Sequence, residues 1–315
     1  MMQSIGCREF VKILLVFMLL FTGITTSQAA TGHCPAQGVW LQVLGSGGPE
    51  LGDRRASSSY LVWQDGHARI MVDAGGGSSL NFEHAGASVN DLEVILFSHF
   101  HVDHSAELPV YIKASFFSDR RRDLPVLGPS GNDLMPSMTD FVQALFAAGT
   151  GAFGYLSEYA DTTQASDYHI RSQDVDASSK TPLTVYQGNG LKLSAIGVHH
   201  GPIPALAWRV ELAGKVLVFS GDMNGAAHTL PLLARKADIL IAHNAVPEKA
   251  TGVARELHMP PSVIGEIAHK ARVKQLVLSH FMLRTLGREK YTAAIIRQKY
   301  HGPVAFAQDM ECFRP

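Results

Sequence analysis

The chain has few cysteines and almost no net charge. It carries three cysteines, and its 27 basic and 28 acidic residues leave a formal net charge of −1. Three cysteines are too few for a small disulfide-based scaffold. The balanced charge argues against a protein that binds a long polyanion by electrostatic attraction. The sequence also has no internal repeat and no low-complexity tract, which excludes a solenoid.

Long apolar runs are scarce, and the clearest one lies near the start of the chain. Arg8 and Lys12 precede the apolar stretch 13–21, and small or polar residues follow it. This order is typical of a secretory signal peptide, and an uncleaved membrane anchor is the alternative. We therefore predict a signal peptide over residues 1–30 and one domain over residues 31–315. The expected location is exported, periplasmic or secreted, with no stable membrane anchor after cleavage.

Two cysteines fall within that domain. Cys34 and Cys312 lie near its opposite ends. In an oxidising compartment they can form a disulfide, and two free, buried thiols are the alternative. Neither lies near a ligand motif, so we do not expect a metal to be held through sulfur.

Three histidines and an aspartate lie within six consecutive positions: His99, His101, Asp103 and His104. They follow the apolar stretch 92–97, a predicted buried strand, and precede residues 105–114, a predicted helix. On an extended segment, positions i and i+2 face the same way, so the first two histidines can converge on one point. The aspartate and the third histidine can reach a second point. Imidazole and carboxylate suit zinc, with iron or manganese as alternatives, and three unrelated surface histidines are the competing interpretation.

The same pattern recurs along the chain, with an apolar strand followed by a histidine or an aspartate. The residues at such strand ends are Asp73, His199, His200, Asp222, His243 and His280. Strand ends at one edge of a layered sheet fold can bring ligands that are distant in sequence into one pocket. For Asp73 two interpretations stay open, a residue that positions a ligand histidine and an ordinary turn aspartate.

Other segments have patterns of their own. Residues 133–148 and 261–271 are predicted helices. Residues 149–181 are rich in small and polar side chains, so we expect an irregular segment at the surface. The run Arg120–Arg122 is expected on a solvated edge.

Together these motifs resemble the metallo-β-lactamase-fold hydrolases, and within them the ribonuclease Z-like and arylsulfatase-like branch. Besides the histidine cluster, the resemblance rests on Leu44–Pro49, Val72–Gly75, His200–Pro202, Ser220–Asp222, Leu257–Met259 and Leu278–Phe281. It spans nearly all of the predicted domain. It implies an α/β fold, a four-layer αβ/βα sandwich of two packed sheets covered by helices, with metals at one edge.

The resemblance also implies ligands for two metals. They are His99, His101 and His200 for one metal, Asp103, His104 and His280 for the second, and Asp222 as a bridge between them. His199, the neighbour of His200, is the alternative at that position. The cofactors implied are two Zn²⁺ ions, with Mn²⁺ or Fe²⁺ as alternatives.

Catalytic roles are implied for Asp103 and His258. His258 matches a family histidine that approaches the substrate and assists proton transfer, and a surface histidine that caps a helix is the alternative. Arg284 is either a residue that holds an anionic substrate or a plain surface arginine. His243 stands where ribonuclease Z members have a histidine followed by glutamate. Here Asn244 follows it, which weakens the RNA-processing interpretation.

These observations predict an exported dinuclear zinc hydrolase. A metal-activated hydroxide would cleave a phosphodiester, a sulfate ester or a related ester in a small molecule. Nucleic acid is not expected as a partner, and a homodimer is left open. The alternatives are a β-lactamase or lactonase of the same fold, or a non-catalytic metal-binding protein.

Overall fold

A computed structural model describes residues 33–315, and the predicted signal peptide lies outside these residues. The first of two seven-stranded sheets has the order β14-β1-β2-β3-β4-β5-β6. Its strands are β1 (Val39–Gly45), β2 (Ser59–Gln64), β3 (His67–Ala74), β4 (Val94–Leu96), β5 (Leu124–Pro129), β6 (Ile170–Val175) and β14 (Cys312–Phe313). Strands β3 to β6 run parallel, so their carboxyl ends meet at one edge.

The second sheet has the order β13-β12-β11-β10-β9-β8-β7. Its strands are β7 (Leu183–Gly188), β8 (Leu191–His200), β9 (Ile203–Leu212), β10 (Lys215–Phe219), β11 (Ile239–His243), β12 (Gln275–Ser279) and β13 (Val304–Phe306). Strands β7 to β10 pair antiparallel, and β10 to β13 pair parallel. This sheet therefore also gathers several strand ends at one edge.

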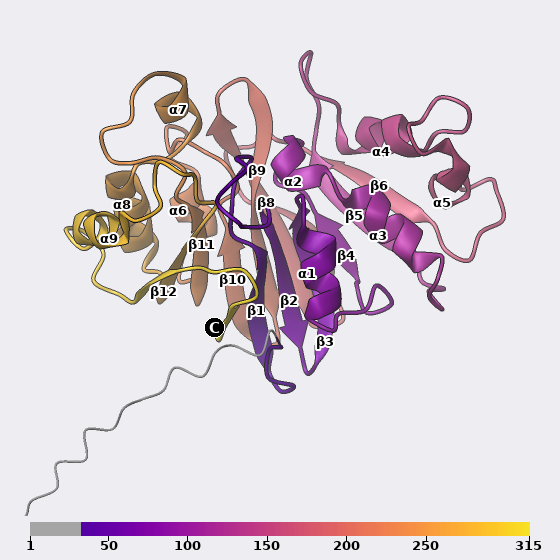
Figure 1. The fold of residues 1–315 in the computed structure, drawn as a ribbon, viewed down its shortest axis with the longest axis horizontal. Coiled ribbons are helices and arrows are strands. Elements are labelled where there is room, and N and C mark those ends of the chain that lie inside the picture. The colour runs from indigo at the N-terminus through magenta and orange to yellow at the C-terminus, as the bar shows by residue number, and fades with distance from the viewer. Residues whose placement is uncertain (1–32) are drawn as a thin grey trace, which may run out of the picture. The chain divides into compact units, whose positions relative to one another are not determined.

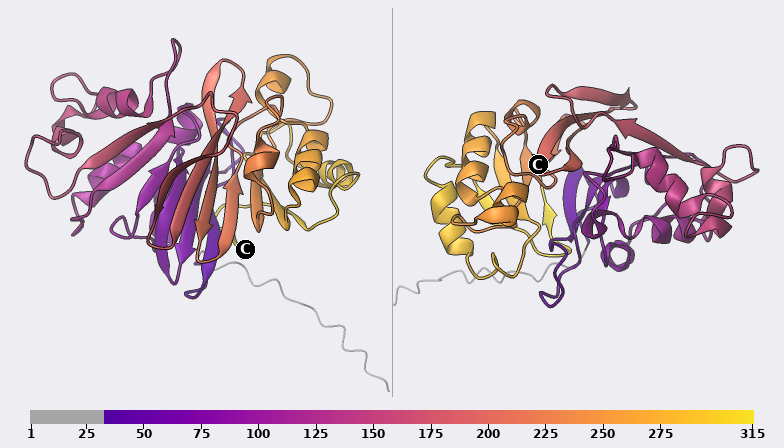
Figure 2. Two further views of the ribbon diagram at one scale, coloured as in Figure 1. Left: turned by 180° about the vertical axis from the view of Figure 1, so that it is seen from behind. Right: turned by 90° about the horizontal axis from the view of Figure 1, so that it is seen from above.

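Helices cover the outer face of each sheet (Figures 1 and 2). They are α1 (Ser78–His84), α2 (Val102–Ser105), α3 (Leu108–Ser115), α4 (Met138–Phe146), the short 3₁₀ helix η1 (Gly154–Leu156), α5 (Ser157–Ala160), α6 (Leu230–Leu233), α7 (Gly252–Leu257), α8 (Pro261–Ala271) and α9 (Glu289–Ile296). Within residues 33–315, none of the helices has the length and apolar character needed to cross a membrane. The predicted four-layer αβ/βα sandwich is confirmed.

Apolar side chains fill three layers, one between the sheets and one beneath the helices of each sheet. In β11, Ile239 and Ile241 belong to the layer between the sheets, while Leu240 and Ala242 pack in the helix-covered layer. Burial on both faces explains why such strands are apolar throughout. Trp208 joins the sheets near the histidine cluster, because its indole Nε1 donates to the carbonyl oxygen of Phe97 at 3.0 Å.

Three predicted boundaries differ from the structure. The predicted helix over residues 105–114 is instead two helices, with α2 ending at Ser105 and α3 beginning at Leu108. Helix α4 begins five residues later than expected, where the Ser137 side chain accepts a hydrogen bond from the N–H of Asp140. The segment 149–181 is not wholly irregular, since it contains β6. That strand was missed because only its first and last residues are buried, which leaves no apolar alternation.

The structure also shows how the two cysteines and the first arginine of the run Arg120–Arg122 are placed. Cys34 and Cys312 form a disulfide with a Cα–Cα distance of 5.6 Å. Arg120 is buried, and its Nη1 donates to the carbonyl oxygens of Val89 and Leu92 at 2.6 and 2.9 Å. The expected solvated edge is therefore wrong for Arg120, although the next two arginines are exposed.

Candidate metal centre

The predicted histidines and aspartates meet at the carboxyl ends of strands from both sheets. The cluster that begins at His99 follows β4, and His200 is the last residue of β8. Asp222 follows β10 by three residues, and His280 directly follows β12. The backbone at Gly221 and His280 has positive φ, 58° and 55°, so the chain turns sharply where β10 and β12 end.

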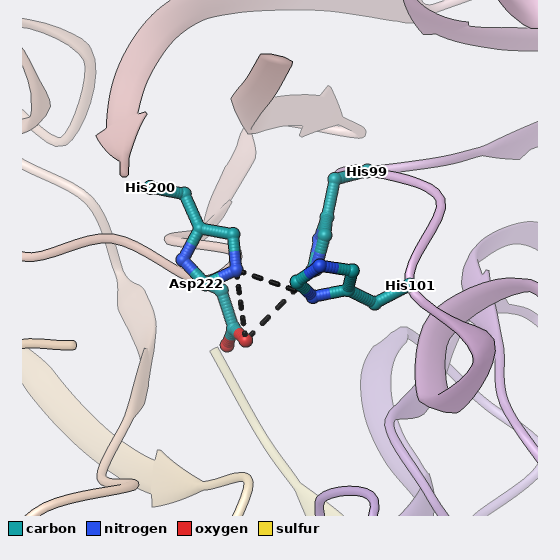
Figure 3. A group of neighbouring side chains, drawn as sticks. All are labelled: His99, His101, His200 and Asp222. Carbon is teal, nitrogen blue, oxygen red and sulfur yellow. Dashed lines mark hydrogen bonds and ion pairs between the residues drawn. The ribbon is translucent and has the colours of Figure 1, made fainter. Parts of the chain in front are cut away.

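One group consists of His99, His101, His200 and Asp222, whose donor atoms all lie within 4.8 Å of one another. Nε2 of His200 lies 3.3 Å from Nδ1 of His101 and 3.7 Å from Oδ2 of Asp222. Nε2 of His99 lies 3.9 Å from the same carboxylate oxygen. Figure 3 shows the imidazoles arriving from both sheets and converging beside Asp222.

A second group surrounds the other side of Asp222. His104, Asp222, His243 and His280 have donor atoms within 4.8 Å of one another. Asp103 also belongs here, because its Oδ2 lies 3.1 Å from Nε2 of His280 and 3.3 Å from Nε2 of His104. Asp222 Oδ1 lies 3.3 Å from His280 Nε2. Asp222 therefore borders both groups.

His243 and Asp103 differ in how free their donor atoms are. Nδ1 of His243 lies 2.7 Å from Oδ1 of Asp222, and its Nε2 lies 3.1 Å from the hydroxyl of Tyr60. Burial lowers the pKa of His243 to about 4, so the ring is neutral and donates its single N–H to the carboxylate. Both ring nitrogens therefore have partners. His243 is better suited to orienting Asp222, and Asp103 to completing the second group.

Burial and charge set the protonation states of the groups that a metal would contact. Burial, and secondly His104, hold the pKa of His99 well below its ordinary value. Burial opposes ionisation of Asp222, but His280 and His258 beside it hold the pKa of its carboxyl well below the usual range. His99 and Asp222 are therefore in the forms that bind cations. Burial opposes protonation of His104 and His280, but neighbouring carboxylates, Asp103 beside His104 and Asp222 beside His280, raise the pKa of both rings, so a cation bound in the second group would displace protons there.

The unpartnered atoms of the site test whether a metal fits. Among residues 33–315, buried nitrogens without a hydrogen-bond partner include Nε2 of His99 and Nε2 of His104. Buried polar atoms normally have partners. Both nitrogens point toward Asp222 Oδ2, at 3.9 and 3.7 Å. These two nitrogens face a carboxylate without a hydrogen bond to it, and such a donor set fits divalent cations such as zinc.

Neighbouring groups fix the orientation of two of the histidines. Oδ2 of Asp73 lies 2.8 Å from Nδ1 of His104, and Oδ1 accepts from the backbone N–H of Ser98 at 2.7 Å. Nδ1 of His200 lies 2.9 Å from the carbonyl oxygen of Leu257. Asp73 thus contacts a histidine of the centre, and it also occupies a turn with a φ of 58°.

The remaining predicted residues lie at different distances from the centre. Nδ1 of His258 lies 3.7 Å from Oδ2 of Asp222. His199 is exposed and its Nδ1 lies 2.9 Å from Nδ2 of Asn224, so the structure brings His200 and not His199 into the first group. The Nε of Arg284 donates to the carbonyl oxygen of Ala245 at 2.7 Å.

Sequence reasoning missed Tyr60 and Ser98. Tyr60 lies in an apolar strand and resembles an ordinary core residue, so nothing in the sequence marks its contact with His243. Ser98 directly precedes the histidine cluster, and its Oγ donates to Asp73 at 2.8 Å. Its place beside the cluster was the available signal.

Comparison with known proteins extends these observations. Residues 68–281 match the family described as the beta-lactamase superfamily domain. Ribonuclease Z of Mycobacterium sp. (strain KMS) is 29% identical over 254 residues, which cover 77% of this chain and 84% of that protein. Ribonuclease Z of Thermobifida fusca (strain YX) is 29% identical over 300 residues, covering 86% and 92%.

Solved structures show the same fold. The metallo-β-lactamase fold protein YhfI from Bacillus subtilis has a TM-score of 0.68 at 19% identity, covering 87% of this chain and 98% of its own. The short form of human tRNase Z has a TM-score of 0.67 at 19% identity, with the same coverage of 87% and 98%.

Two predictions are wrong by these comparisons. We predicted a small-molecule ester as the substrate and did not expect nucleic acid. This conflicts with the relatives, which are ribonuclease Z proteins that align with most of this chain. The error came from net charge, which is a global sum and does not describe local contacts, and from the weight given to Asn244. The predicted export to the periplasm or beyond conflicts with the same ribonuclease Z relatives. It rested on residues 1–30, which lie outside the described residues.

The predicted resemblance itself is confirmed, since the family match spans more than half of the chain. By that match, the chain belongs to the β-lactamase superfamily and is a metal-dependent hydrolase.

Proposed function

We propose that this protein is a dinuclear metal-dependent phosphodiesterase that cleaves RNA. The observation that carries the proposal is the position of Asp222 between two groups of histidines, with 3.7 Å to His200 on one side and 3.3 Å to His280 on the other. A carboxylate placed in this way can bind two cations at once, which is the arrangement of two-metal phosphodiester chemistry. RNA is the substrate class named by the ribonuclease Z relatives.

The two cation positions differ in their ligands. The ligands proposed are His99 Nε2, His101 Nδ1 and His200 Nε2 for the first, Asp103 Oδ2, His104 Nε2 and His280 Nε2 for the second, and the Asp222 carboxylate for both. Three imidazoles suit zinc at the first position. The added carboxylate at the second position also suits Mn²⁺ or Fe²⁺.

Divalent cations, when bound, lower the pKa of a water molecule and neutralise charge that develops on a phosphoryl oxygen. The chain's own residues then orient and move protons. His243 holds Asp222 Oδ1 in place, and the oxygen of Asp103 that does not bind the cation can accept a proton from the attacking group. Nδ1 of His258 lies beside Asp222, and because burial lowers the pKa of His258 to about 3, its ring is neutral and would donate a hydrogen bond to the leaving oxygen. The Nη groups of Arg284 make no hydrogen bond within residues 33–315 and can bind a phosphate oxygen.

The proposal is tested by metal analysis and hydrolysis on the same protein samples. Purified protein loaded with Zn²⁺ should cleave a labelled RNA oligonucleotide and bis(p-nitrophenyl) phosphate, and a chelator should abolish both activities. His101→Ala and Asp103→Ala should lose metal and activity together, with an unchanged circular dichroism spectrum. His199→Ala, a change at an exposed histidine outside the centre, is the matched control.

Full activity in His101→Ala or Asp103→Ala would mean that the ligands are misassigned. Hydrolysis of nitrocefin by a zinc-loaded protein that leaves both phosphodiesters intact would instead identify a β-lactamase.

A further inference from the structure

One histidine of the centre lacks the supporting contact that two of its neighbours have. Nδ1 of His104 lies 2.8 Å from Oδ2 of Asp73, and Nδ1 of His200 lies 2.9 Å from the carbonyl oxygen of Leu257. Nδ1 of His280 is also buried, yet it has no hydrogen-bond partner in the described part of the chain. A histidine that binds a metal through one nitrogen is normally oriented through the other. A different kind of contact must therefore fix the His280 ring.

The ring of His280 packs closely against the backbone of Gly48. A Cβ atom added to Gly48 would lie 2.8 Å from Cε1 and 3.2 Å from Nδ1 of His280. The same atom would lie 2.7 Å from Sδ of Met282, whose flexible side chain can move away. Carbon atoms in contact are normally about 3.5 to 4.0 Å apart. Because the φ of Gly48 is not positive, the close approach to the ring, and not a turn, is what requires glycine here.

Two main-chain hydrogen bonds hold Gly48 beside this ring. The N–H of Gly48 donates to the carbonyl oxygen of Phe281 at 3.0 Å, and the N–H of Phe281 donates to the carbonyl oxygen of Ser46 at 2.8 Å. Phe281 directly follows His280 in the chain. We call Ser46, Gly47 and Gly48 the glycine segment. The glycine segment is therefore bonded to the residue next to His280, and neither can shift without breaking these hydrogen bonds.

Asp309 anchors the glycine segment. Its Oδ1 accepts from the N–H and from the hydroxyl of Ser46, at 2.9 and 2.6 Å, and its Oδ2 accepts from the N–H of Ala56 at 2.7 Å. The guanidinium of Arg55 lies over the ring of Phe281, with its central carbon 5.1 Å from the ring centroid. These contacts tie the glycine segment both to the C-terminal part of the chain and to the residue after His280.

We propose that Gly48 is a positioning residue for the second metal position, because its bare backbone sets the angle at which the His280 ring presents Nε2. This inference rests on the proposed function and deepens it. Nε2 of His280 lies 3.1 Å from Oδ2 of Asp103 and 3.3 Å from Oδ1 of Asp222. A side chain at position 48 would rotate the ring or push the glycine segment away. Either movement takes Nε2 away from the point that it shares with the two carboxylates.

The first test is the zinc affinity of Gly48→Ala, measured by competition against a chromophoric chelator. The variant should bind one of its two zinc ions about tenfold or more weakly, and this should be the ion that His280→Ala loses. The matched control is Gly265→Ala in α8, whose added Cβ would lie 2.8 Å from the carbonyl oxygen of Ile296 in α9. The control should lower the urea midpoint and leave both zinc constants unchanged.

A second variant disturbs the glycine segment without adding an atom beside the ring. In Asp309→Asn, the amide oxygen can still accept from Ser46, but the amide NH₂ faces the N–H of Ala56, and two donors cannot bond to each other. Affinity for the same zinc ion should fall by a smaller factor than in Gly48→Ala. If Gly48→Ala does not fold, Asp309→Asn decides the question, and unchanged zinc constants in it would overturn the proposal.

A double-mutant cycle tests whether Gly48 acts through His280. In metal-free protein, Gly48→Ala should lower the urea midpoint clearly in the wild type and much less in His280→Ala, which has no ring to crowd. An equal shift in both backgrounds would overturn the proposal. So would unchanged zinc constants in Gly48→Ala, or an equal loss of affinity in Gly265→Ala. A wild-type protein that binds two zinc ions and leaves RNA intact would contradict the proposed function alone, since these measurements do not depend on cleavage.

Discussion

Replacing Asp73 by asparagine should weaken one of the two proposed metal positions while the backbone keeps its shape. Asp73 is 1% exposed, its Oδ2 lies 2.8 Å from Nδ1 of His104, and its Oδ1 accepts from the N–H of Ser98 at 2.7 Å. Its φ of 58° lies in the left-handed region, which asparagine tolerates better than most residues. The variant therefore preserves the turn and changes the hydrogen-bonding pattern.

The changed pattern acts through the tautomer of His104. A carboxylate only accepts hydrogen bonds, so it selects the imidazole that carries its proton on Nδ1 and leaves Nε2 free for a metal. In the variant, the amide oxygen stays opposite the N–H of Ser98, and the amide NH₂ faces Nδ1 of His104. That arrangement selects the tautomer with the proton on Nε2, which cannot bind a cation without losing it.

The expected loss of affinity at the second position is about 10- to 100-fold, the usual effect of removing such a supporting contact. This corresponds to about 1.4 to 2.8 kcal/mol. The first position, whose histidines make no direct contact with Asp73, should change much less. When Zn²⁺ is limiting, activity on a phosphodiester should fall by at least the same factor as the zinc affinity. Excess Zn²⁺ should restore part of this activity.

The assay is a competition for Zn²⁺ against a chromophoric chelator, which resolves two successive binding constants. Asp238→Asn is the matched control, because Asp238 is also buried and accepts from the N–H of Val216 at 2.8 Å and from Lys274 at 2.6 Å. The control should lower stability without changing zinc affinity. If Asp73→Asn binds both zinc ions as tightly as the wild type, the argument from the tautomer is refuted.

Three further predictions concern stability and the support of the centre. Cys312→Ser removes the disulfide to Cys34 and should lower the free energy of unfolding by about 2 to 5 kcal/mol in urea denaturation; an unchanged midpoint would show that the two cysteines are not joined in solution. Leu240→Ala opens a cavity beneath the helices of the second sheet and should cost about 2 to 5 kcal/mol, with zinc affinity unchanged by the same chelator competition. Tyr60→Phe removes the hydroxyl beside His243 and should cost about 0.5 to 1.5 kcal/mol. Its activity at saturating zinc should fall less than that of Asp73→Asn, and a larger fall would mean that Tyr60 has a direct catalytic role.

Much of the fold could be predicted because the buried strands are apolar and several of them are followed by a histidine or an aspartate. Helix α8 was predicted with the bounds that the structure shows. His200, Asp222 and His280 could be placed together because each stands at or just after a strand end, and parallel or adjacent strands bring such ends to one edge. Their roles as metal ligands remain a proposal.

Other features could not be read from the sequence because they depend on contacts between distant segments. Arg120 looks like part of a solvated run, yet its guanidinium bonds to carbonyl oxygens near residue 90 and is buried by them. Strand β6 lies at the edge of its sheet with polar residues on both faces, so pairing with β5 and not apolar alternation defines it. The position of Tyr60 against His243 joins the two sheets, and no local pattern encodes such a contact.

The pairing of β14 with β1 has a consequence for how the molecule is assembled. Phe313 lies opposite Leu41, and the N–H of Met310 donates to the carbonyl oxygen of Val43 at 2.7 Å. Strand β1 can therefore pair with β14 only at the end of synthesis, because β14 is made after every other strand of both sheets. Because the segments around Cys34 and Cys312 are neighbours in space, a circularly permuted chain that links them and is opened at an exposed loop should still reach the native topology.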